Sequence, residues 1–260
     1  TTHYPEGYFS HVVIDECHRS AWGQWSQVLT RNPAAMHIGL TATPRQLKLR
    51  QWTKEAEQDQ RVTADNLRYF GEPIYEYGLA QAIEDGYLAV FEIQQGRVNL
   101  DDTGLTLDEI VARNPVDAVT GQAVGVEELR TRYEKTQYED RLLLPDRVLA
   151  MAQDLFNHLL ATGGPEQKTI IFCARDRHAD DVAAALNNLY AQWCAVNGRE
   201  RLDCYAFKCT AASSGNDQLP DFRGAARHHF IATTVDLLTT GVDVPAVRNI
   251  VFFRYVRSPI

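Results

Sequence analysis

Two adjacent carboxylates, Asp15 and Glu16, directly follow an apolar run in the stretch FSHVVIDECHRSAW. Neighbouring side chains at the exit of a strand point in different directions, so the two acids can take different tasks. One can hold Mg²⁺, which prefers one or two carboxylates together with phosphate oxygens, while the other deprotonates an attacking water. These are the tasks of ATP hydrolysis. A solvated turn or a helix N-cap is the alternative interpretation of the same pair.

The bulk composition limits the classes of protein to consider. A chain of 260 residues can form one large domain or two modest ones, and its contents of 45% hydrophobic and 23% charged residues are ordinary for a globular protein. The net charge of −8 gives no bulk basic field, so any contact with nucleic acid must be local. No apolar run approaches the roughly 20 residues that span a bilayer. Five scattered cysteines suit reduced thiols in a cytoplasmic protein.

The pattern of apolar residues predicts the strands and helices that position the acid pair. The run before Asp15 is continuous, which is typical of a parallel strand covered on both faces. A polar helix is expected over Gln46–Phe70, and amphipathic helices are expected around Val148–Leu159 and Val182–Trp193. Strands are expected at Phe9–Ile14, Met36–Leu40, Tyr87–Ile93, Gly96–Leu100, Thr169–Ala174, Leu202–Phe207, Phe230–Thr233 and Asn249–Phe253. Alternating strands and helices predict an α/β fold with parallel sheets, and ligands bind such sheets outside the carboxyl ends of the strands.

Three further motifs accompany the DECH stretch in a fixed order. Met36–Pro44 is MHIGLTATP, Thr169–Ala174 is TIIFCA and is followed by RDRH, and Ala232–Pro245 is ATTVDLLTTGVDVP. Singly, each fits an ordinary strand exit or a glycine-centred turn. Together they resemble motifs II, III, IV and V of superfamily 2 helicases and translocases. The resemblance implies two RecA-like domains, with ATP and Mg²⁺ as cofactors.

Longer stretches indicate a narrower family. Phe70–Ile93, Tyr138–Met151 and the final Phe253–Ile260 look like stretches of the motor (R) subunits of type I restriction enzymes, and type III enzymes share parts of them. The resemblance covers nearly the whole chain and is loosest at residues 101–136. It implies double-stranded DNA as substrate, and the modification and specificity subunits of a restriction complex as partners, in the cytoplasm.

The resemblance also implies a division of the chain. Residues 1–90 correspond to the C-terminal half of motor domain 1, residues 91–145 to a linker or insertion, and residues 146–260 to motor domain 2. A phosphate-binding GxxxxGK[ST] loop is expected before motif II, and the arginine of motif VI is expected after Ile260. Gly163–Thr169, GGPEQKT, does not replace that loop, because it lacks the glycine before the lysine and precedes a strand, whereas such a loop follows one. We therefore expect the chain to be part of a longer protein, with the first RecA-like domain incomplete.

The family's functional residues map onto single positions. Asp15 is expected to coordinate Mg²⁺, and Glu16 is expected to be the catalytic base. The other assignments are coupling residues His18, Thr41 and Thr43, nucleotide contacts Gly241 and Asp243, and nucleic-acid contacts Thr234, Arg175 and Arg177. Relatives often carry threonine just before the motif V acid, where this chain has Val235, and the two arginines also fit a solvated strand-exit loop.

Other candidate sites and functions are weaker. Cys17 and His18 are too close in sequence to chelate a metal readily, and His228-His229 is expected at the surface. A general DNA or RNA helicase shares the expected chemistry with a restriction motor. A binding module that retains the fold without hydrolysing ATP is the alternative of another class, and the intact acids and threonines argue against it.

Overall fold

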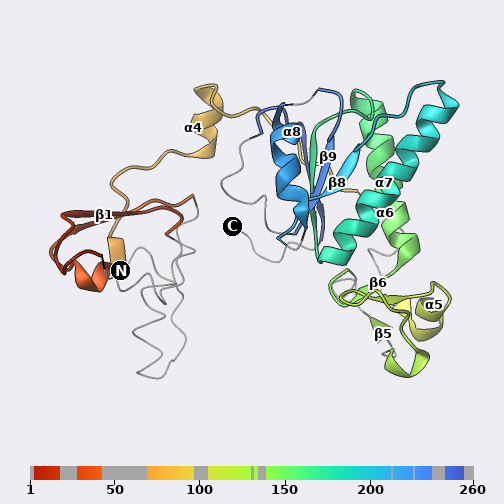
Figure 1. Cartoon of the computed structure of the whole chain (residues 1–260), viewed down its shortest axis with the longest axis horizontal. Helices are drawn as coiled ribbons and strands as arrows, with labels where there is room; N and C mark the ends of the chain where they lie inside the picture. Colours follow the sequence, from red (N-terminus) through yellow and green to blue (C-terminus); the bar gives the residue numbers. More distant parts are fainter. Residues whose placement is uncertain are drawn as a thin grey trace. The chain divides into compact units, whose positions relative to one another are not determined.

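The computed structural model divides the chain into two units (Figure 1), Thr1–Glu92 with Ile260, and Ile93–Pro259. The residues it describes are 3–17, 28–42, 69–96, 105–129, 132–133, 139–211, 213–224, 226–235 and 244–254. Each unit is considered separately. None of the helices in these ranges is long and apolar enough to cross a membrane.

The first unit contains a parallel strand pair. β1, His11–Ile14, pairs with β2, Met36–Gly39, in a register that sets Ile14 opposite Gly39. Both strands were predicted, with slightly longer bounds. The expectation that both faces of β1 are covered is wrong, because Val13 is 59% exposed. On the covered face, a Cβ at Gly39 would lie 3.0 Å from the ring of Phe70 and from the sulfur of Cys17, so glycine permits this close packing.

The segment after Phe70 contains one short helix, α4, at Leu79–Glu84. The predicted strand Tyr87–Ile93 does not form, and residues 89–96 have no regular secondary structure. Gly86 turns the chain after α4 with φ of 79°, and no described strand pairs with the residues that follow. The predicted helix Gln46–Phe70 lies outside the described residues except for its last two, which are helical, and Gly96–Leu100 lies outside them except for Gly96.

The second unit opens with a small lobe, residues 105–144, where the sequence predicted a linker or insertion. Its elements are β3 (Leu105–Thr106), α5 (Leu107–Val111), β4 (Val116–Asp117), η1 (Val126–Glu128), β5 (Arg132–Tyr133) and β6 (Leu142–Leu143). β3 pairs with β5 and β4 pairs with β6, both antiparallel. Leu105, Ile110, Leu129, Leu142 and Leu144 form a core of the lobe. The segment is therefore folded, although its strands are too short to show a periodic pattern.

The main part of the second unit is a four-stranded parallel sheet within the described residues, ordered β10-β7-β9-β8. The strands are β7 (Thr169–Cys173), β8 (Ala206–Lys208), β9 (Ile231–Thr234) and β10 (Asn249–Phe253). The predicted strands Thr169–Ala174, Phe230–Thr233 and Asn249–Phe253 are confirmed, while β8 lies later than the predicted Leu202–Phe207. Because all four strands are parallel, their carboxyl ends share one edge.

Helices cover both faces of this sheet, which gives it the three layers expected of a RecA-like domain (Figure 1). α6 (Pro145–Thr162) and α7 (Asp176–Val196) pack on one face, where Tyr190 and Tyr205 stack with ring centroids 4.0 Å apart. α8 (Leu219–Gly224) follows η3 (Ser214–Gln218) and places Phe222 against Phe172 and Phe207 on the other face. The predicted α/β class with parallel sheets is confirmed.

Candidate functional site

The acid pair lies at the carboxyl end of β1. Asp15 is exposed and Glu16 is half-buried, and an Asp15 Oδ1 accepts a hydrogen bond of 2.9 Å from the backbone amide of Glu16. Glu16 adopts a left-handed conformation with φ of 51°, which costs a non-glycine residue about 1–2 kcal/mol. Such strain persists where the surroundings enforce it, often at functional sites. The turn therefore gives the two adjacent carboxylates different environments.

Backbone hydrogen bonds join this turn to the end of β2. The amide of Leu40 donates to the carbonyl of Ile14 over 2.8 Å, and the amide of Cys17 donates to the carbonyl of Leu40 over 2.9 Å. The parallel pairing thus continues past both strands, and it brings the Asp15-Glu16 turn alongside the segment that leads to Thr41. Of the predicted coupling residues, Thr41 is half-buried, while His18 and Thr43 lie outside the described residues.

The environment of Cys17 does not favour a nucleophilic role for its thiol. Its side chain is buried, and burial raises the pKa of the thiol, as do the negative charges of Glu16 and Asp15, against an opposing backbone hydrogen bond. A nucleophilic cysteine needs a lowered pKa, because the thiolate is the reactive species. The carboxylates, rather than the thiol, are the groups at this strand end that are suited to chemistry.

In the second unit, Arg175 and Arg177 follow β7 at the carboxyl edge of the sheet. Arg175 binds Asp140 of the small lobe through its carboxylate at 2.7 Å and its backbone carbonyl at 3.0 Å. Arg177 pairs with Asp181 at 3.1 Å, one turn further along α7. Both arginine side chains are about half exposed, and exposed pairs of this kind contribute only about 0–1 kcal/mol. Either arginine can therefore exchange its carboxylate for a phosphate at little cost.

The predicted motif V residues are only partly described. Thr234 ends β9 and its side chain is fully buried, and its role as a phosphate contact stays a prediction. Arg254, just after β10, donates to the carbonyl of Val235 over 3.2 Å and lies over the ring of Phe172. Gly241 and Asp243 lie outside the described residues.

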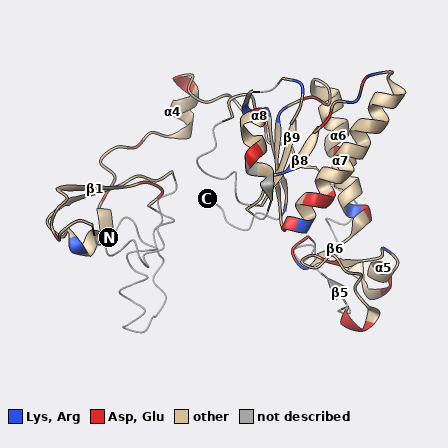
Figure 2. Ribbon diagram, viewed as in Figure 1, with Lys and Arg blue, Asp and Glu red and all other residues tan. Residues whose placement is uncertain are grey.

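The structure adds a polar cluster that the sequence did not predict. Lys208, at the end of β8, binds Asp176 at 2.8 Å and Asp180 at 2.7 Å, and the Thr210 hydroxyl donates to Asp176. Figure 2 shows the acidic residues near the start of α7. Burial lowers the pKa of Lys208, but the hydrogen bonds and charges of both aspartates outweigh it and raise that pKa. The i, i+4 spacing of Asp176 and Asp180 places both carboxylates on one face of a helix, which is a signal in the sequence. The sequence does not show that Lys208 of β8 lies beside that face.

Comparisons with known proteins match the acid pair and most of the chain. The profile of the SWI2/SNF2 ATPase family matches residues 9–118, which include β1, β2 and the acid pair. The EcoAI type I restriction enzyme endonuclease subunit of Escherichia coli is 30% identical over 256 residues, covering 96% of this chain and 28% of that protein. The EcoKI subunit of Escherichia coli strain K12 is 30% identical over 239 residues, covering 87% of this chain and 18% of that protein.

A solved structure agrees with the sequence relatives. It is a fragment of a protein assigned as the HsdR subunit of a type I restriction enzyme from Vibrio vulnificus YJ016, with a TM-score of 0.59 and 27% identity. The match covers 99% of this chain and 39% of that chain. The predicted resemblance to superfamily 2 helicases and type I restriction subunits is confirmed. This chain spans about a quarter of the EcoAI relative's length.

Proposed function

We propose that this chain is part of an ATP-driven double-stranded DNA translocase in a type I restriction endonuclease. The observation that carries the proposal is the backbone hydrogen bond of 2.9 Å from the Cys17 amide to the Leu40 carbonyl. It joins the segment that contains the proposed hydrolytic acids, Asp15 and Glu16, to the segment that contains the proposed coupling residue Thr41. The SWI2/SNF2 profile across the same residues supports ATP as the nucleotide.

The two carboxylates are proposed to divide the work. Asp15 is an exposed carboxylate at the end of a parallel strand, which is the kind of ligand that Mg²⁺ takes alongside phosphate oxygens. ATP with Mg²⁺ supplies the phosphoryl group that is transferred to water. Glu16, half-buried and turned by its positive φ, orients a water molecule and accepts its proton.

The remaining assignments concern residues proposed to couple ATP hydrolysis to movement along DNA. Thr41 follows the joined segment and is proposed to couple the state of the acids to the DNA-bound surface. The other proposed members are the coupling residues His18 and Thr43, nucleotide contacts Gly241 and Asp243, and DNA contacts Thr234, Arg175 and Arg177. Arg175 and Arg177 are the described members with exposed cationic groups, which suits backbone contacts to DNA.

The domain assignment and the partners belong to the same proposal. Residues 1–90 are proposed as the C-terminal half of motor domain 1, residues 91–145 as a linker or insertion that includes the small lobe, and residues 146–260 as motor domain 2. The full protein is proposed to act in the cytoplasm with modification and specificity subunits. The similarity to two endonuclease subunits of type I enzymes supports this assembly.

The test uses the full-length protein assembled with its partner subunits. A translocase should hydrolyse ATP fastest on long double-stranded DNA, and it should displace a triplex-forming third strand without separating the duplex. Efficient unwinding of a short tailed duplex, with no triplex displacement, would favour a general helicase. Binding of DNA with no ATP hydrolysis on any substrate would favour a module that only binds.

A further inference from the structure

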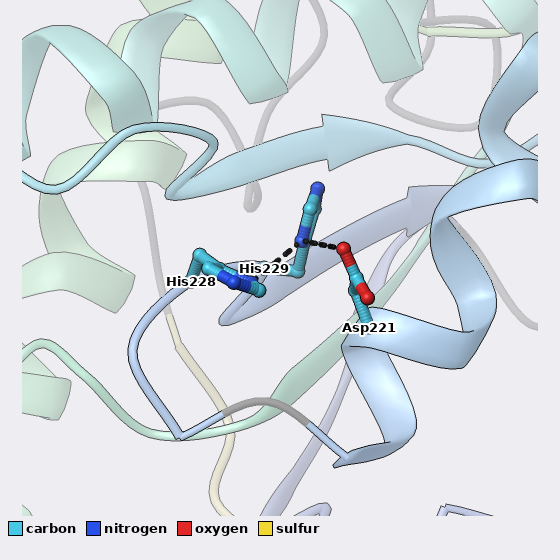
Figure 3. Close-up of side chains that lie close together, drawn as sticks. All are labelled: Asp221, His228 and His229. Atoms are coloured by element: carbon cyan, nitrogen blue, oxygen red, sulfur yellow. Dashed lines mark hydrogen bonds and ion pairs between the residues drawn. The ribbon is translucent and has the colours of Figure 1, made fainter.

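Three side chains that can bind a metal converge beside the amino end of β9 (Figure 3). Asp221 comes from α8, and His228 and His229 come from the turn that precedes β9. One ligand atom from each of the three lies within 4.8 Å of the others. Because this is the amino edge of the parallel sheet, the cluster lies at the opposite edge from Arg175, which follows the carboxyl end of β7.

The backbone makes the two histidines face each other. Consecutive side chains on an extended chain point to opposite sides, but His229 has a left-handed φ of 53°. As a result the Nδ1 atoms of His228 and His229 lie only 3.1 Å apart. Conformations of this kind are strained for residues other than glycine and persist where the surroundings enforce them.

Neighbouring groups hold this turn in place. The amide of His229 donates to the carbonyl of Cys204 over 2.7 Å. The ammonium of Lys168 donates to the carbonyls of His228 at 3.1 Å and His229 at 2.8 Å. The sequence predicted a surface position for the histidine pair, and this was wrong for His229, which is only 6% exposed. The turn is folded back onto the sheet, so the ring is fixed.

The two ring nitrogens of His229 have different surroundings. Its Nε2 has no hydrogen-bond partner among the described residues and is buried, and the ring is in edge contact with Phe207. Its Nδ1 instead faces the Nδ1 of His228 and lies 3.8 Å from an Asp221 carboxylate oxygen. A neutral imidazole has one lone pair, so two such nitrogens directed at one point suit a shared proton or a shared cation.

The spacing suits a transition-metal ion. Zn²⁺ binds imidazole nitrogen at about 2.0–2.1 Å and carboxylate oxygen at about 2.0–2.2 Å in a tetrahedron, which separates neighbouring ligand atoms by about 3.3 Å. The observed separations of 3.1 and 3.8 Å lie on either side of this value. The Asp221 side chain is 59% exposed and can approach by the remaining half ångström.

We propose that Asp221, His228 and His229 bind one Zn²⁺ or a similar divalent transition metal, with water in the fourth position. Two imidazoles and one carboxylate favour such ions over Mg²⁺, which prefers oxygen ligands. The nearby positive charge of Lys168 opposes a second cation, so the affinity is weaker than that of structural sites with four protein ligands. Bound metal links α8 to the turn before β9 and stabilises that face of the second unit.

Metal titration of the untagged full-length protein, stripped with a chelator and free of nucleotide, tests the proposal. Calorimetry with Zn²⁺ should show a site that His228→Ala and Asp221→Asn each weaken at least about tenfold. Both side chains are partly or largely exposed, so these variants should fold. His158→Ala is the matched control, because it removes a half-exposed histidine of α6 and should leave the Zn²⁺ affinity unchanged.

Co²⁺ absorption and thermal unfolding give independent readouts. The wild type and His158→Ala should show an intense visible band with Co²⁺ and a rise in unfolding temperature with Zn²⁺, and the two cluster variants should show neither. Zn²⁺ binding that is absent from the wild type, or equal in the wild type and both cluster variants, would overturn the proposal. Neither result depends on ATP hydrolysis, so the outcome is independent of the motor function.

Discussion

The backbone amide of Cys17 lies 2.9 Å from the carbonyl oxygen of Leu40, and this hydrogen bond joins the residues that follow β1 to those that follow β2. It comes after the last residue of either strand, so it extends the parallel pairing into the two loops. A change in the position of Asp15 or Glu16 is therefore transmitted directly to the backbone before Thr41. This pairing constrains the backbone position of the two acids relative to the loop that follows β2.

Substitution of the two acids should separate their roles. In the full-length protein, Glu16→Gln removes the proposed base while keeping its shape, so DNA-stimulated ATP hydrolysis should fall by about 10²-fold or more with ATP binding retained. Asp15→Ala should weaken Mg²⁺-dependent nucleotide binding as well. Steady-state hydrolysis together with equilibrium binding of Mg²⁺-ATP measures both effects. Near-normal hydrolysis by Glu16→Gln would contradict the assignment of the base.

The arginines after β7 are expected to contact DNA phosphates. Removing one such contact, by Arg175→Gln or Arg177→Gln, should reduce the slope of log affinity against log salt by about 0.9 for duplex DNA. Arg113→Gln is the control, because Arg113 pairs with Asp146 and is not a predicted DNA contact. Binding of duplex DNA by the full-length protein across a range of salt concentrations gives the slopes. Equal slopes for all three variants and the wild type would exclude direct contacts by Arg175 and Arg177.

The sequence predicted the elements whose pattern is local. β7 and β10 are continuous apolar runs, α6 and α7 have clear apolar faces, and the placement of Asp15 after β1 follows from the preceding run. Each of these signals is contained within a single element. That is why the α/β class and the exposed acid were predictable without knowledge of tertiary contacts.

The features that were missed depend on contacts between distant residues. Lys208 meets Asp176 and Asp180 only because β8 lies beside the start of α7. His229 is buried because a left-handed backbone turns it inward, and nothing in the dipeptide itself signals this conformation. The strands of the small lobe have two residues each, too few for the alternation that marks a strand.

A buried ion pair should hold the small lobe to α6. The side chains of Glu139 and Arg147 are 2% and 5% exposed, and they meet at 2.7 Å. Glu139→Gln removes the negative charge that meets this buried arginine, and breaking a buried pair typically costs about 3–5 kcal/mol. The neighbouring Asp140→Asn is the control, because its pair with Arg175 is about half exposed and should contribute only about 0–1 kcal/mol. Urea unfolding of both variants compares the costs, and equal small losses would show that the buried pair does not stabilise the lobe.

His178 should make the stability of the second unit depend on pH. Its side chain is fully buried on α7, and burial, with a contribution from the positive charge of Arg147, lowers its pKa from 6.5 to about 3. In the unfolded chain the imidazole gains a proton near pH 6.5, whereas in the folded chain it stays neutral. The unfolded state therefore binds more protons between these two values, and the histidine's contribution is present above pH 6.5 and lost as the pH falls toward 3. The loss is at most about 1.4 kcal/mol per pH unit.

His178→Gln isolates this contribution, because glutamine does not titrate and can still accept the hydrogen bond that the Ala174 amide gives to Nδ1. The variant should be less stable than the wild type at pH 7.5 by a packing loss that does not depend on pH. On lowering the pH to 4.5, the wild type should lose more stability than the variant, so the difference between them should shrink or reverse. Urea unfolding at both pH values measures it. A difference that stays constant between pH 7.5 and 4.5 would mean that His178 is already able to take up a proton in the folded protein.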